Sequence, residues 1–141
     1  MIRALLDTNV IVSSTISEYG PSRRILEAWV ADRFALIAPE SQLAELGRVL
    51  GYERIRGRYG VDEERAGELL SLVIRKATIL EDPLDAANVV DDTGDNILLA
   101  AAIESGADFL VTGDQALLNL HYYGSTAILA PRQFLEQLLK T

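Results

Sequence analysis

Two stretches of the chain share one layout, in which an apolar run is followed by an aspartate. They are IRALLDTNVIV at residues 2–12 and DFLVTGDQALL at residues 108–118. Short apolar runs rich in branched residues are typical of buried strands. A carboxylate at the edge of a core is costly unless it is paired. Asp7 and Asp114 are therefore the first candidates for a functional site.

The rest of the chain alternates between strand-like and helix-like segments. Strands are predicted near Ile2–Leu6, Ala35–Ala38, Thr78–Leu80, Phe109–Thr112 and Ala127–Leu129. Helices are predicted near Ser22–Asp32, Pro39–Leu50, Asp62–Lys76, Asp95–Ser105 and Pro131–Lys140, with a short helix after Asp114. This order predicts an α/β fold with a parallel sheet covered by helices on both faces.

Size and composition indicate one domain with a substantial core. The chain has 141 residues, 49% of them hydrophobic, and no cysteine, which excludes disulfides and thiolate zinc sites. No apolar run approaches the ~20 residues of a membrane span, and Asp7 interrupts any signal-peptide pattern. We therefore expect a soluble, cytoplasmic protein with no membrane partner.

The formal net charge of −8 argues against a passive nucleic-acid coat. The charge is unevenly spread, however. Residues 81–95 contain six acids and no base, whereas residues 48–60 contain four arginines and one glutamate. An acidic protein can still act on nucleic acid if metal ions offset some carboxylates and a local basic patch holds the strand.

Parallel sheets bind ligands at the carboxyl ends of their strands. Asp7 and Asp114 are predicted at that edge, after the first and fourth strands. Asp95 is predicted to begin the helix that leads into the fourth strand, and crossover helices start at the same edge. Glu40 and Glu45 lie in the first two turns of the helix after the second strand, and the spacing alone leaves the choice between them open.

Clustered carboxylates indicate a site for a hard divalent cation. Ionised carboxylates a few ångströms apart repel one another, and Mg²⁺ prefers such oxygen ligands. The chain has one histidine, His121, and neither G-x-x-x-x-G-K-[ST] nor G-x-G-x-x-G. Each aspartate alone also suits a helix cap. Their joint placement at one edge favours metal chemistry.

Three motifs resemble the PIN-domain ribonucleases, most closely the VapC-like toxins of toxin–antitoxin pairs. They are LLDTNVIVS at residues 5–13, PESQLAELGRVL at 39–50 and DNILLAAAIESGADFLVTGD at 95–114. The similarity extends from Ile2 to about Leu139. It implies a single PIN-like, Rossmann-like domain over residues 1–141, built as a three-layer α/β/α sandwich with a mostly parallel sheet of about five strands. It also implies an endoribonuclease that cleaves single-stranded RNA with Mg²⁺ or Mn²⁺, forms a homodimer and pairs with an antitoxin.

The same resemblance implies the roles of individual residues. The catalytic, metal-holding acids fall on Asp7, Glu45, Asp95 and Asp114, so the resemblance selects Glu45 over Glu40. Asn9 and Thr112 are implied as supporting polar groups.

One departure concerns the segment before the third acid. Gly94 stands where relatives often carry an acid. Asp91 or Asp92 is expected to compensate through a water, which leaves a second metal ion unassigned.

The segment RVLGYERIRGRYG at residues 48–60 is predicted to bind RNA. Arg54, Arg56 and Arg58 alternate along it, beside tyrosines able to stack on bases. The alternative is a solvated loop whose arginines pair with Glu63 and Glu64.

Two other functions remain open from the sequence. A haloacid-dehalogenase-like phosphatase also places an aspartate after its first strand, but it needs a second one two positions on, where Asn9 stands. A catalytically inactive protein-binding module would retain the acids without using them.

Overall fold

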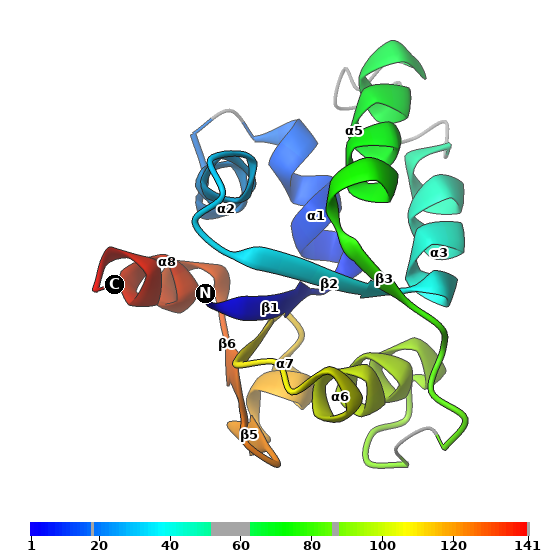
Figure 1. The fold of residues 1–141 in the computed structure, drawn as a ribbon, viewed down its shortest axis with the longest axis vertical. Coiled ribbons are helices and arrows are strands. Elements are labelled where there is room, and N and C mark those ends of the chain that lie inside the picture. The colour runs from blue at the N-terminus through cyan, green and yellow to red at the C-terminus, as the bar shows by residue number, and fades with distance from the viewer. Residues whose placement is uncertain (18, 52–62, 86–87, 141) are drawn as a thin grey trace.

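The computed structural model describes residues 1–17, 19–51, 63–85 and 88–140. Figure 1 shows a central sheet between two layers of helices. The strands are β1 (Arg3–Leu6), β2 (Ala35–Pro39), β3 (Thr78–Leu80), β4 (Phe109–Val111), β5 (Tyr122–Tyr123) and β6 (Thr126–Leu129). The helices are α1 (Thr8–Ile16), α2 (Pro21–Val30), α3 (Glu40–Leu50), α5 (Glu63–Lys76), α6 (Thr93–Ser105), α7 (Gln115–Leu118) and α8 (Pro131–Leu139).

The six strands form one sheet in the order β3-β2-β1-β4-β6-β5. Every neighbouring pair is parallel except β5 and β6. Leu6 pairs with Val111, so β1 and β4 end side by side. The predicted mostly parallel sheet is confirmed, and this register brings the residues after both strands to one edge.

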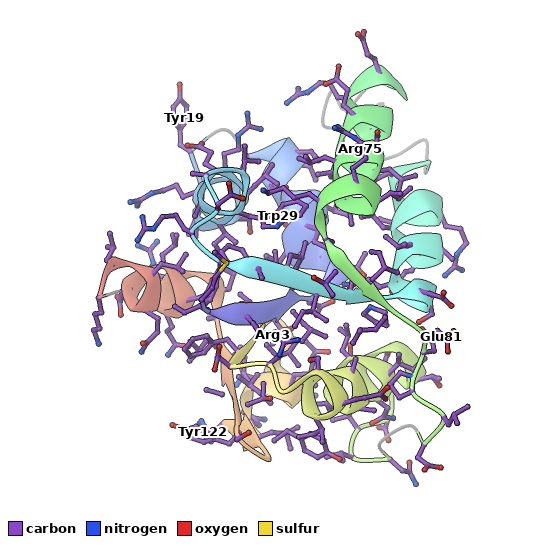
Figure 2. The ribbon with its side chains drawn as sticks, in the orientation of Figure 1. Arg3, Tyr19, Trp29, Arg75, Glu81 and Tyr122 are labelled. Carbon is purple, nitrogen blue, oxygen red and sulfur yellow. The ribbon has the colours of Figure 1, made fainter. Side chains whose placement is uncertain are left out.

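Alternation along the strands separates two apolar cores. Ala4 and Leu6 of β1 face one core and Leu5 faces the other, as expected for a strand with a period of two residues. The first core lies under α1, α2, α3, α5 and α8, and the second lies under α6 and α7. Trp29, fully packed in the first core, is labelled in Figure 2. The predicted three-layer sandwich is confirmed.

The prediction of about five strands missed β5. This strand has two residues and pairs antiparallel at the edge of the sheet. His121 before it and Gly124 after it both have positive φ, at 60° and 59°. A strand this short carries no readable alternation, so its position depends on the turn around it.

Two helices also differ from the prediction. The helix α1 was not predicted, because its residues TNVIVSSTI are mostly buried and show no polar face with helical period. The helix α6 begins at Thr93 and not at Asp95, because the Asp92 carboxylate accepts a 2.9 Å hydrogen bond from the Asp95 backbone N–H and caps the helix. Gly106 ends α6 in the left-handed conformation with φ 66°.

Among the residues that the structure describes, no helix has both the length and the apolar character needed to cross a membrane.

Candidate active site

The buried carboxylate of Asp7 joins the ends of β1 and β4. Its backbone N–H donates to the Val111 carbonyl at 2.8 Å, and its Oδ2 accepts a 2.7 Å hydrogen bond from Thr112 Oγ1. Asp7 precedes α1, but its side chain makes no capping hydrogen bond to that helix. Asp7 is 8% exposed and Thr112 is 0% exposed. Backbone hydrogen bonds from Asn9 and Thr8 nevertheless lower the pKa of Asp7, so the start of α1 also contributes to holding this carboxylate.

Asp114 lies just after β4 and makes two hydrogen bonds. Its backbone N–H donates to Thr112 Oγ1 at 3.0 Å, which ties it to the hydroxyl that holds Asp7. Its side chain accepts a 2.9 Å hydrogen bond from the Ala116 N–H and caps α7. The capping alternative therefore holds for Asp114, while its charge also reaches the other acids.

Asp95 lies in the first turn of α6, and neighbouring carboxylates raise its pKa. Burial raises its pKa to about 7, together with a hydrogen bond to Asp114 and the negative charges of Asp7 and Asp92. Burial also raises the pKa of Asp7, the Thr112 hydrogen bond lowers it, and the charge of Asp114 raises it further. Asp7, Asp95 and Asp114 therefore form one electrostatic cluster.

Glu45 approaches this cluster from the second turn of α3. Its Oε2 accepts a 3.1 Å hydrogen bond from Thr8 Oγ1, the residue after Asp7. A Cβ placed on Gly94 would lie 4.0 Å from the same Oε2, so Glu45 faces the first turn of α6. Glu40 is exposed at the start of α3, and no contact among the described residues joins it to the cluster.

Sequence reasoning missed Gln42, which is one helical turn before Glu45 and 4% exposed. Its Nε2 donates to the Leu6 carbonyl at 2.6 Å and lies 3.4 Å from Thr8 Oγ1. Its Oε1 has no hydrogen-bond partner among the described residues. The only available signal was an amide on the face of α3 that carries Glu45.

Asn96 was also missed. It is 7% exposed, and its Oδ1 accepts from the backbone N–H groups of Val89 and Val90, at 3.0 and 3.1 Å. Its Nδ2 donates to the Val90 carbonyl at 2.7 Å. Asn96 thus fixes the segment that enters α6 beside the acids.

The remaining predicted residues are placed as follows. Asn9 is exposed at the second position of α1, and Asp91 is exposed two residues before Thr93, the first residue of α6. Arg54, Arg56 and Arg58 lie outside the described residues, as do Tyr52 and Tyr59.

The fit of this site to a metal ion depends on its donor atoms. Among the described residues, no three acidic or histidine side chains are grouped closely enough to hold an ion as they stand. The available donors are nevertheless carboxylate oxygens, and the pKa values of Asp7 and Asp95 are raised by burial and by the charges of neighbouring aspartates. This chemistry fits a hard divalent cation that keeps several water ligands.

Comparison with known proteins agrees with the fold. A family model described as PIN domain matches residues 3–116. The uncharacterized protein MJ1680 of Methanocaldococcus jannaschii is 29% identical over 119 residues, which are 84% of this chain and 75% of that protein. A chain in the crystal structure of VapBC2 from Rickettsia felis, bound to a DNA fragment from their promoter, superposes with TM-score 0.64 at 15% identity and covers 92% of this chain and 98% of that chain. At 15% identity the structural match shows the fold alone. The family model covers most of the chain and shows that this chain belongs to the PIN-domain family.

Proposed function

We propose that this chain is a ribonuclease that hydrolyses phosphodiester bonds of single-stranded RNA with Mg²⁺ or Mn²⁺, and that it is the toxin of a toxin–antitoxin pair. The observation that supports the proposal is the electrostatic coupling of Asp7, Asp95 and Asp114 at one edge of the sheet, with Glu45 bound to Thr8 beside Asp7. Membership of the PIN-domain family, whose members are nucleases, supports the hydrolase chemistry.

In this proposal Asp7, Asp95 and Asp114 hold the ion, and Glu45 orients a water molecule. A bound divalent ion would supply positive charge that acidifies a water and offsets charge developing on the phosphate. The chain's own contribution is orientation. Thr112 fixes Asp7 through its hydroxyl, and Thr8 fixes Glu45.

Protonation of Asp95 fits this role. With a pKa of about 7, the carboxyl group holds its proton for part of the time at neutral pH. Because carboxylates must be deprotonated to bind a cation, ion binding would release that proton. Asn9 and Asp92 are proposed to contact water molecules around the same edge.

RNA is proposed to be held by Arg54, Arg56 and Arg58. Cations that neutralise phosphates supply most of the affinity for nucleic acid. The acidic edge cannot provide them, and residues 48–60 carry the densest run of arginine in the chain.

A small antitoxin and a second copy of this chain are the proposed partners. The Rickettsia felis VapBC2 complex, which resembles this fold, was solved on a DNA fragment from its promoter. That match supports an antitoxin for this chain, and the homodimer rests on the sequence resemblance.

The test is cleavage of labelled RNA and DNA panels by wild type and Asp7→Asn, in Mn²⁺ and in excess EDTA. Asn keeps an acceptor for Thr112 and removes the charge, so folding is expected to persist while cleavage of RNA falls at least ~100-fold. The matched control is Asp108→Asn, since Asp108 precedes β4, at the opposite edge of the sheet from Asp7, and accepts a 2.9 Å hydrogen bond from the Arg3 N–H.

Three outcomes would contradict the proposal. They are full activity of Asp7→Asn, equal activity in EDTA, and an equal loss in Asp108→Asn. A small phosphoester is assayed in parallel, because turnover of that compound without RNA cleavage would favour a phosphatase.

A further inference from the structure

The negative charge of the chain is concentrated in one part of it. Residues 77–131 contain nine acids and no lysine or arginine, which leaves twelve acids and thirteen bases for the rest of the chain. This segment supplies α6, α7 and the strands β3 to β6, and its helices form the layer below the sheet in Figure 1. We refer to residues 77–131 as the acidic segment.

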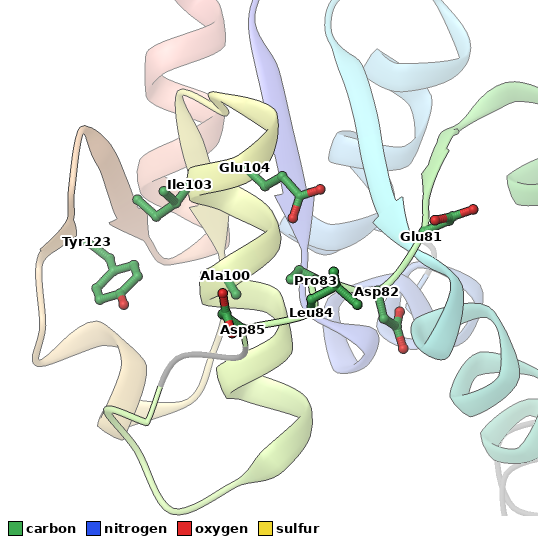
Figure 3. Close-up of a pocket in the computed structure, with 9 residues that line it drawn as sticks. All are labelled: Glu81, Asp82, Pro83, Leu84, Asp85, Ala100, Ile103, Glu104 and Tyr123. Atoms are coloured by element: carbon green, nitrogen blue, oxygen red, sulfur yellow. The ribbon is translucent and has the colours of Figure 1, made fainter.

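A groove runs along the outer side of this layer. Its volume is about 650 Å³, and it is bounded by the chain after β3, by α6 and by β5. Figure 3 shows Tyr123 and Ile103 toward one end, and Glu81 and Asp82 toward the other. The lining residues are Glu81, Asp82, Pro83, Leu84, Asp85, Ala100, Ile103, Glu104 and Tyr123.

Five of these nine side chains are apolar or aromatic, and they include the least covered leucine of the described residues. Leu84 is 101% exposed and Ile103 is 47% exposed. An uncovered apolar patch bordered by polar groups is typical of an interaction surface. The groove thus has apolar contact area that this chain leaves uncovered.

The rim of the groove is uniformly anionic. Its four charged side chains are Glu81, Asp82, Asp85 and Glu104, and the lining contains no base. Asp82 also accepts a 3.0 Å hydrogen bond from the Ser41 N–H, which fixes the rim to α3. Charges of one sign beside exposed apolar side chains favour a partner of the opposite sign.

The groove is distinct from the candidate active site. Ile103 and Glu104 lie on the last turns of α6, whereas Asp95 lies on the first. Eight residues of helix separate Asp95 from Ile103, which is roughly 12 Å at the rise of an α-helix. A ligand in the groove therefore does not need the active-site carboxylates.

We propose that this groove is a docking surface for a basic, amphipathic segment of a partner protein. Apolar side chains of that segment cover Leu84 and Ile103, and its lysines or arginines pair with the acidic rim. RNA is unsuited as the ligand of this groove, because every charged side chain of the lining is a carboxylate and would repel its phosphates. The acidic segment of a second copy is unsuited for the same reason.

The test measures binding of a fluorescent synthetic peptide with leucine and lysine at helical spacing to the full chain by anisotropy. Comparison peptides replace every lysine by glutamate or every leucine by serine. Only the basic, amphipathic peptide is expected to bind, and raising salt from about 50 to about 300 mM is expected to weaken it. Leu84→Ser and Glu104→Lys are each expected to weaken binding at least about fivefold.

Matched controls distinguish binding at the groove from non-specific binding of the peptide elsewhere on the surface. Val30→Ser removes an apolar side chain that is 51% exposed on α2, and Glu64→Lys reverses an exposed charge on α5. Both are expected to bind the peptide as wild type does. Because Leu84 is fully exposed, its replacement leaves the fold intact, and RNA cleavage by Leu84→Ser reports separately on the proposed function.

Any of three results overturns the docking surface. They are no binding of the basic peptide, equal binding of the glutamate peptide, and equal weakening by Val30→Ser and Leu84→Ser. Self-association of wild type that disappears in Leu84→Ser would also overturn it, because the occupant would then be a second copy of this chain.

Discussion

The hydroxyl of Thr8 binds the carboxylate of Glu45, with 3.1 Å between Oγ1 and Oε2. This contact joins the residue after Asp7, at the start of α1, to the acid on α3. Gln42 supports this contact between Thr8 and Glu45. Its Nε2 donates to the Leu6 carbonyl at 2.6 Å and lies 3.4 Å from Thr8 Oγ1. The orientation of Glu45 therefore depends on buried polar groups that carry no charge.

Replacing Thr8 by valine is expected to lower kcat of RNA cleavage about tenfold with little change in KM. The buried methyl group preserves packing, but Glu45 loses the donor that orients it, and supporting hydrogen bonds around metal sites are typically worth 10- to 100-fold. Steady-state kinetics of Thr8→Val and Thr8→Ser provide the comparison. Serine keeps the hydroxyl and is expected to retain most activity. Equal kcat for wild type and Thr8→Val would show that the contact has no role in catalysis.

Replacing Thr112 by valine is expected to destabilise the protein by roughly 1–3 kcal/mol at neutral pH. Two bonds are lost, because Thr112 Oγ1 donates to buried Asp7 at 2.7 Å and accepts from the Asp114 N–H at 3.0 Å. Urea unfolding without metal measures the change. Thr112→Ser keeps both bonds and is expected to lose less. A stability unchanged in Thr112→Val would mean that water replaces the hydroxyl at no cost.

The sequence was sufficient to predict most of the sheet and the edge at which the acids gather. Parallel strands have one carboxyl edge, so an acid that follows a strand can be placed without knowing its contacts. The short strand β5 and the buried helix α1 escaped, because one is two residues long and the other has no polar face. Both depend on what surrounds them.

The polar support of the site could not be predicted in the same way. Gln42 and Thr8 meet only because α3 is rotated so that Gln42 faces the end of β1. That rotation is set by packing between helices and not by a local pattern. The helix cap before Asp95 is a related case, since VVDDTGDN offers three aspartates and only the structure identifies Asp92 as the cap.

Alanine at two glycines is expected to have unequal costs. Gly106 and Gly124 both have positive φ, at 66° and 59°, which costs a residue with a Cβ roughly 1 kcal/mol. A Cβ at Gly106 meets its nearest atom at 3.9 Å, whereas at Gly124 it would lie 2.4 Å from Ile103 Cδ1. Because Ile103 is 47% exposed and its Cδ1 can shift, Gly124→Ala is expected to be only slightly the more destabilising change in thermal unfolding.

Ile103→Val is the control for that difference, because it removes Cδ1 and leaves Cγ1, which would lie 3.8 Å from the added Cβ. In a double-mutant cycle it is expected to recover stability in Gly124→Ala and not in Gly106→Ala. A similar recovery in both would place the cost in the backbone alone.

Without metal, the acidic edge is expected to make the protein less stable as pH rises from about 4 to about 7. The pKa of Asp95 is raised from 3.8 to about 7, and that of Asp7 is also raised. In this window the folded state holds more protons than the unfolded state, so stability is full below the unfolded pKa and is lost toward the folded pKa. Because solvent screens the half-buried Asp95, its contribution to this change in the free energy of unfolding is limited to roughly 1–2 kcal/mol.

Asp95→Asn measures this share, because it removes the titrating group and keeps the side-chain shape. In EDTA, the variant is expected to gain stability over wild type as pH rises, and the difference is read from urea midpoints at pH 5 and 8. Excess Mn²⁺ is expected to stabilise wild type at pH 8 more than Asp95→Asn, since the ion offsets a charge that the variant lacks. A wild type that matches the variant at both pH values would place Asp95 outside the electrostatic cluster.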